Sequence, residues 1–117
     1  MPVAIDHIDL RVPDLAAAES FLTRLGFEVF RRHASRSSIE LRLPGSEFGT
    51  LEVRESADVT TTTLDHIAVR AADAHGVRAT WEARGVEFTG PFREIAETGR
   101  SVANVVDPGG LKWQLTD

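Results

Sequence analysis

The sequence predicts an α+β fold of two tandem βαβββ modules, forming a curved mixed sheet around an open cleft with the helices on its outer face. Two observations predict this fold: an internal repeat, and alternating apolar and polar residues where each copy begins. The length of 117 residues, with 42% hydrophobic and 26% charged residues, is typical of one globular domain. We therefore expect a single domain over residues 1–117, with modules at about 4–55 and 64–117.

The repeat is seen when the sequence is shifted by 59 residues. The segment DHIDLR at 6–11 then falls on DHIAVR at 65–70, and seven of the 25 positions from Asp6 to Phe30 are identical. Only two copies occur, which is too few for a solenoid of stacked repeats. The pattern therefore indicates a duplicated structural unit.

A three-residue gap extends the match toward the end of each copy. Residues 39–53 then overlay 101–115, which places Glu52 opposite Gln114. We therefore expect these two side chains to occupy equivalent positions of the repeat.

The first copy begins with a strand over residues 5–12, where side chains alternate with the period of a half-buried strand. Asp14 can cap the following helix, and Gly26 suits its C-terminal end. Four apolar residues share one face of this helix: Leu15, Ala18, Leu22 and Leu25. Three strands are expected after it, at 28–33, 38–43 and 49–54.

The second copy repeats this order after a polar linker at 55–63. Asp73 is the expected helix cap, Gly85 the helix end, and Val77 and Trp81 the inward-facing residues. Strands are expected at 65–71, 87–89, 102–106 and 112–116, with a Pro108-Gly109-Gly110 turn before the last one. Residues 90–100 follow neither period, which leaves a flap over a site or a plain surface connection.

Charge and composition exclude several classes of protein. The net charge is −5, and the densest basic cluster (Arg31, Arg32 and Arg36) is typical of a solvated edge, so we expect no nucleic-acid partner. The absence of cysteine excludes disulfides and thiolate sites. No apolar run exceeds four residues, and no secretory leader is present, so we expect no membrane association and a cytoplasmic location.

Strand parity places four polar residues on the face of the sheet opposite the helices. They occupy two pairs of equivalent repeat positions, and imidazole, carboxylate and amide groups together suit a divalent ion. The four are His7, Glu52, His66 and Gln114. A purely structural role stays open, because duplication also copies residues that serve only folding. His33 and His75 have no such partners and are expected at the surface.

Four segments resemble the vicinal oxygen chelate superfamily, which includes glyoxalases, bleomycin-resistance proteins and extradiol dioxygenases. They are DHIDLRVPDL at 6–15, LGF at 25–27, LDHIAV at 64–69 and DPGG at 107–110. The resemblance covers nearly the whole chain and implies a divalent metal (Zn, Ni, Co or Mn) held by the same four residues. It is closest to the glyoxalase I pattern, although Gln114 stands where that pattern usually has glutamate.

This resemblance implies a glyoxalase-like, metal-dependent lyase or isomerase that stabilises an enediolate formed from a small oxygen-chelating carbonyl substrate. Glu52 would carry the proton as the catalytic residue. Arg11, Arg42 and Arg70 share the parity of the open face and could bind an anionic substrate, or could form salt bridges with Asp9 or Glu40. The resemblance also implies a homodimer with shared sites.

The alternative is a metal-free binding protein of the bleomycin-resistance type. An acidic chain suits a cationic drug, and Phe48, Phe88 and Phe92 are aromatic candidates for stacking on it. Trp81 and Trp113 are instead expected in the core, which argues against an aromatic box.

Overall fold

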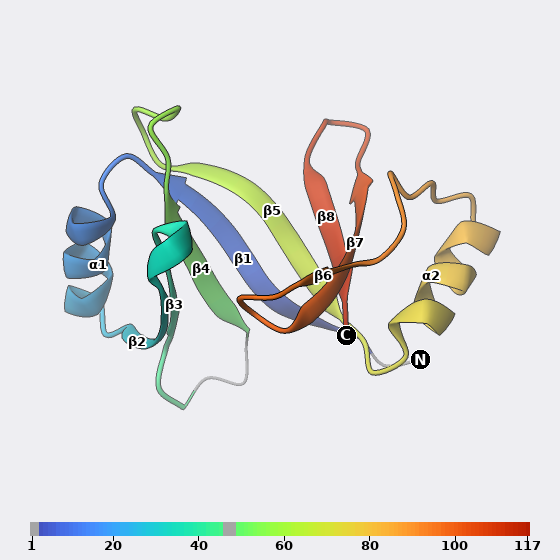
Figure 1. The fold of residues 1–117 in the computed structure, drawn as a ribbon, viewed down its shortest axis with the longest axis horizontal. Coiled ribbons are helices and arrows are strands. Elements are labelled where there is room, and N and C mark those ends of the chain that lie inside the picture. The colour runs from blue at the N-terminus through green and yellow to red at the C-terminus, as the bar shows by residue number, and fades with distance from the viewer. Residues whose placement is uncertain (1–2, 46–48) are drawn as a thin grey trace. The chain divides into compact units, whose positions relative to one another are not determined.

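The computed structural model describes residues 3–45 and 49–117, and their contacts divide the chain into two compact units (Figure 1). The first unit is His7–Asp65; the second is His66–Asp117 together with the N-terminal residues up to Asp6. The boundary falls within two strands, β1 (Ala4–Val12) and β5 (Thr63–Arg70). The described chain repeats the order βαβββ, which confirms the predicted α+β fold.

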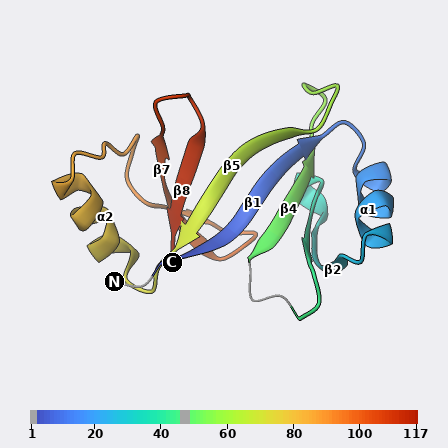
Figure 2. The same cartoon turned by 180° about the vertical axis from the view of Figure 1, so that it is seen from behind.

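The first unit is a mixed sheet with one helix beside it (Figure 2). Its strands lie in the order β2-β3-β4-β1, with β1 parallel to β4 and the other pairs antiparallel. Its further elements are α1 (Leu15–Arg24), β2 (Glu28–His33), the short 3-10 turn η1 (Ala34–Arg36), β3 (Ser38–Arg42) and β4 (Thr50–Glu55).

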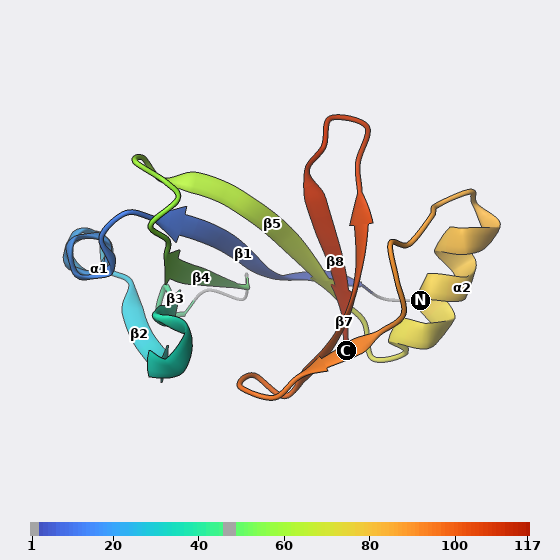
Figure 3. The same cartoon turned by 45° about the horizontal axis from the view of Figure 1, so that its top comes forward.

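The second unit repeats this arrangement, with strands in the order β5-β8-β7-β6 and β5 parallel to β8 (Figure 3). Its further elements are α2 (Ala74–Ala83), β6 (Arg93–Ile95), β7 (Arg100–Val106) and β8 (Lys112–Thr116). Neither α1 nor α2, the helices of the described residues, is long and apolar enough to cross a membrane.

Equivalent residues begin and end the two helices, as predicted. Asp14 and Asp73 each accept a hydrogen bond of 3.0 Å from the amide three residues further on. Gly26 (φ 104°) and Gly85 (φ 90°) adopt the left-handed conformation that follows a helix end and that other residues rarely adopt.

Each unit has its own apolar core between helix and sheet. In the first, four buried strand residues pack against Leu15, Ala18 and Leu22 of α1: Val12, Ile39, Leu41 and Val53. In the second, the buried cluster is Ala71, Ala74, Val77 and Leu115, and Trp81 packs against it. The predicted inward position of Leu25 is wrong, because α1 ends at Arg24 and the Leu25 side chain is exposed.

The segment after α2 differs from the prediction. Residues 87–89 form no strand; Thr89 makes one backbone hydrogen bond to Asn104, and Gly90-Pro91 follows. Proline cannot donate to a strand ladder, so pairing resumes only at Arg93–Ile95, which forms β6 and pairs with β7. Part of the irregular segment at 90–100 is therefore the edge strand and turn of a hairpin.

The structure also shifts the alignment of the two repeat copies by two residues at β3 and β7. Glu40 is the Cα partner of Glu52 across β3 and β4, and Asn104 is the partner of Gln114 across β7 and β8. The structural equivalent of Glu40 is therefore Asn104, whereas the sequence overlay placed Val102 there. The connection between β7 and β8 is two residues shorter than that between β3 and β4, which accounts for the difference.

Candidate functional site

The sheet of the first unit carries a row of three buried acids on the face away from α1. Asp9 is the Cα partner of Glu52, and Glu52 is the partner of Glu40, so the row crosses β1, β4 and β3. These residues are 1%, 3% and 0% exposed, respectively. Neighbouring strands lie only about 4.8 Å apart, and buried carboxylates are costly unless they are paired. Each of the three has a different partner.

Glu52 lies beside two nitrogen-bearing side chains, His7 and Arg36, at distances longer than a hydrogen bond. Its Oε2 lies 3.7 Å from Nε2 of His7, and its Oε1 lies 3.7 Å from Nη1 of Arg36. Oε1 is buried and has no hydrogen-bond partner among the described residues. The carboxylate is thus desolvated but only loosely held, and it can accept a further ligand.

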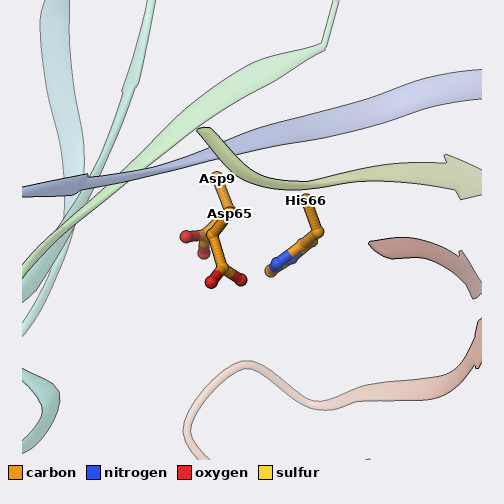
Figure 4. A group of neighbouring side chains, drawn as sticks. All are labelled: Asp9, Asp65 and His66. Atoms are coloured by element: carbon orange, nitrogen blue, oxygen red, sulfur yellow. The ribbon is translucent and has the colours of Figure 1, made fainter. Parts of the chain in front are cut away.

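Asp9 shares Arg11 with a second acid, Asp65 of β5. Arg11 Nε lies 3.1 Å from Asp9 Oδ1, and its Nη2 lies 3.2 Å from Asp65 Oδ2. Figure 4 shows the two carboxylates side by side, and one oxygen of each lies within 4.8 Å of the other. The figure also labels His66, the next residue of β5, which belongs to the second unit. Burial first, and the Glu52 charge second, raise the pKa of Asp9 to about 6, although Arg11 opposes the shift.

This shift predicts how stability depends on pH. A folded-state pKa of about 6, above the ordinary 3.8, means that Asp9 costs stability as the pH rises from about 4 to about 6. We expect Asp9→Asn to remove a cost of roughly 3 kcal/mol at pH 8 and little at pH 4. Urea unfolding of the EDTA-treated protein measures the difference. Asp58→Asn, at an exposed linker residue, is the control; an equal effect of Asp9→Asn at both pH values would contradict the prediction.

Glu40 has its own partners in β2. His33 Nε2 lies 2.7 Å from Glu40 Oε2, and Arg31 Nη1 lies 3.9 Å from the same oxygen. The predicted surface position of His33 is wrong, because its side chain is only 9% exposed. His75 is exposed as predicted and contacts the Phe92 ring. Glu40 therefore belongs to a buried ion pair that stabilises the sheet.

The second unit carries neutral groups where the first carries acids. Gln114 is buried and lies between Ala68 of β5 and Asn104 of β7, its Cα partners. The side-chain oxygen of Asn104 is buried without a hydrogen-bond partner among the described residues. His66 of β5 is also buried and has Lys112 as its Cα partner. This row can donate and accept hydrogen bonds but supplies no carboxylate.

The structure therefore brings His7 and Glu52 together in the first unit and places His66 and Gln114 on equivalent strands of the second. The three predicted arginines differ in their surroundings. Arg11 bridges two acids, Arg42 lies over the Phe30 ring with its Cζ 5.1 Å from the centroid, and Arg70 is exposed with Nη1 3.8 Å from Asp6 Oδ1.

The aromatic candidates of the alternative function pack within the second unit. Phe88 stacks on Trp81 at a centroid distance of 6.1 Å, and the guanidinium of Arg78 lies over both Phe88 and Phe92. Trp113 is half-buried, and its indole nitrogen donates a 3.1 Å hydrogen bond to Asp107. Phe48 lies outside the described residues.

Sequence reasoning left four polar residues of this region out of the candidate metal site: Asp9, His33, Arg36 and Glu40. Asp9 and Glu40 were expected only as possible salt-bridge partners of the arginines, and the Arg11–Asp9 pair is present. The parity that selected His7 also applies to Asp9, so that residue could have been found. Arg36 was assigned to a solvated edge, but its side chain is only 19% exposed. Its contact with Glu52, like that of His33 with Glu40, depends on pairing between strands that the sequence pattern does not specify.

The sequence matches the Glyoxalase/Bleomycin resistance protein/Dioxygenase superfamily over residues 4–115. The chain belongs to this superfamily. A comparison with curated proteins finds no match.

Solved structures share the fold at low sequence identity. Methylmalonyl-CoA epimerase from Mycobacterium tuberculosis is similar with a TM-score of 0.77 and 19% identity, over 97% of this chain and 86% of that one. A variant of the Streptomyces coelicolor epimerase in complex with 2-nitronate-propionyl-CoA has a TM-score of 0.74 and 21% identity, over 97% and 95%. A hypothetical protein from Bacillus halodurans C-125 has a TM-score of 0.77 and 15% identity, over 99% and 94%. These likenesses show the fold.

The donor groups of the chain fit a divalent ion, the cofactor typical of this superfamily. Glu52 offers a buried oxygen, Oε1, that makes no hydrogen bond to residues 3–45 or 49–117, and the imidazole of His7 lies 3.7 Å from its other oxygen. Imidazole and carboxylate are ligands of Zn and other first-row metals, and an amide oxygen can complete such a set. Asp9 and Asp65 are less suited, because Arg11 already contacts both carboxylates.

Proposed function

We propose that the chain is a metal-dependent isomerase or lyase of the glyoxalase type, acting on a small carbonyl compound with two adjacent oxygens. The observation that supports this most strongly is the state of Glu52. Its carboxylate is buried and lies 3.7 Å from His7 and from Arg36, and one of its oxygens has no hydrogen-bond partner in the part of the chain that the structure describes. A carboxylate in this state can bind a metal ion and can also be released from it to move a proton.

In this proposal His7, Glu52, His66 and Gln114 hold the ion, which is Zn, Ni, Co or Mn. When bound, such an ion would supply Lewis-acid chemistry at a carbonyl oxygen, which lowers the pKa of the adjacent C–H group. Gln114 is neutral and cannot act as a base.

The proton is moved by the carboxylates of the first unit. Glu52 takes the proton from the substrate carbon. It returns the proton either to the neighbouring carbon or to the opposite face of the same carbon. Asp9, the Cα partner of Glu52, has a pKa of about 6 and is partly protonated near neutral pH. It can therefore help to hold a single proton on this pair of acids. The epimerase names of two structural neighbours support an isomerase more than a lyase.

Metal content tests the proposal. After dialysis against mixed divalent ions and removal of the excess, we expect one tightly held ion per chain by elemental mass spectrometry. His66→Ala should lose it, whereas His75→Ala, at an exposed histidine, should keep it. If the wild type retains no ion, the metal-dependent reaction is wrong and a metal-free binding protein becomes the better interpretation.

Three further features stay predictions from the sequence and the resemblance. They are a single domain built of two modules, a homodimer with sites shared between subunits, and a cytoplasmic location.

A further inference from the structure

Arg36 faces Glu52 without forming a hydrogen bond to it. Its Nη1 lies 3.7 Å from Glu52 Oε1, and its side chain is 19% exposed, so a ligand can reach it. A guanidinium carries five N–H donors in a planar fork that matches a carboxylate. Within the described part of the chain, no residue accepts a hydrogen bond from this guanidinium. Its donors are available to a ligand that approaches Glu52.

The turn that carries Arg36 is fixed against the sheet. Ser37, which follows η1, has a left-handed backbone (φ 50°), a conformation that non-glycine residues rarely adopt. The carbonyl of Arg36 accepts a 3.2 Å hydrogen bond from Arg54 Nε, and the carbonyl of Ser37 accepts one of 2.9 Å from the Glu55 amide. Strained residues held by their surroundings are typical of binding sites. The turn therefore presents the guanidinium from a defined position.

Of the three buried acids Asp9, Glu52 and Glu40, the one that faces Arg36 is Glu52, and their contact is long. Asp9 has Arg11 at 3.1 Å and Glu40 has His33 at 2.7 Å, whereas the ion-pair contacts of Glu52 with described residues are the two of 3.7 Å. When Glu52 binds a divalent ion, its charge is shared with that ion, and the attraction between Glu52 and Arg36 weakens. An anionic group on the substrate can then replace Glu52 as the partner of Arg36.

We propose that Arg36 binds a carboxylate group of the substrate, so that the chain acts on anionic carbonyl or hydroxy acids rather than on neutral carbonyl compounds. This inference rests on the proposed function, because it places the substrate beside Glu52. It adds a specificity residue from η1, separate from the three arginines selected by strand parity.

Binding of lactate and lactamide tests the inference. Both offer adjacent oxygens, and only lactate carries a carboxylate. Isothermal titration calorimetry of the metal-loaded protein should show lactate binding at least about tenfold more tightly than lactamide, as expected for one charge-assisted pair. Arg36→Gln should reduce the preference about tenfold by weakening lactate alone, leaving only what the ion's own affinity for a carboxylate supplies, and Arg36→Lys should keep part of the Arg36 contribution. Arg31→Gln, which removes the same charge beside Glu40, is the matched control and should keep the preference.

Three results would overturn the inference: equal binding of both ligands to the wild type, binding of neither, or an unchanged preference in Arg36→Gln. Circular dichroism of each variant checks that the fold is intact. The metal content of the same samples reports on the proposed function alone. If the protein holds the metal ion but shows no preference for lactate, the role of Arg36 is rejected and the metal site stands. If the wild type holds no metal ion, both the metal site and the role of Arg36 are rejected.

Discussion

Glu52→Gln is expected to lower turnover by about 10²–10⁴-fold, the range contributed by general acid–base catalysis, while the protein stays folded. Glutamine has nearly the same size as glutamate, so the packing of β4 against β1 and β3 is preserved. It also removes a buried charge whose Oε1 has no hydrogen-bond partner among the described residues, so the free energy of unfolding should not fall. What is lost is the only carboxylate among the four predicted ligands.

Two measurements test this effect. One is the initial rate with a panel of α-ketoaldehydes and 2-hydroxy acids, and the other is exchange of the substrate C–H proton, followed by NMR. Glu28→Gln is the control, because Glu28 is an exposed acid at the start of β2. Full activity of Glu52→Gln would reject Glu52 as the base. If circular dichroism instead shows that the variant is unfolded, the view that the Glu52 charge is dispensable for folding is rejected.

His33→Ala is expected to destabilise the protein by about 1–3 kcal/mol, the usual cost of removing the hydrogen-bond partner of a buried polar group. Glu40 is completely buried, and its Oε2 lies 2.7 Å from Nε2 of His33. Arg31, whose Nη1 lies 3.9 Å from the same oxygen, is half-exposed and can compensate only in part. Chemical denaturation monitored by tryptophan fluorescence measures the loss.

Arg32→Ala is the matched control for this prediction. Arg32 precedes His33 on β2, and its ion pair with Glu19, with an N–O distance of 2.6 Å, lies at the surface. Exposed pairs contribute little because water and salt screen them. Equal losses for the two variants would contradict the view that the His33–Glu40 pair stabilises the sheet through its burial.

Local patterns predicted most of the secondary structure. Alternating residues identified β1 and β5, aspartates identified both helix starts, and glycines both helix ends, because each signal depends on residues within one turn or strand. The same parity predicted that His7 and Glu52 share a face, and the structure places them 3.7 Å apart. The missing strand at 87–89 and the exposed Leu25 show where a local pattern does not decide packing.

The partners of the buried acids depend on contacts that no local pattern specifies. A bulge between Val29 and Arg31 shifts the register of β2, and it is this shift that sets Arg31 opposite Glu40. The turn η1, with its left-handed Ser37, directs Arg36 toward Glu52. Repetition and periodicity in the chain thus determined the duplicated fold and the face of its polar residues. Strand register and one turn decided which cation each carboxylate meets, because pairing of distant segments is set by the whole packed sheet.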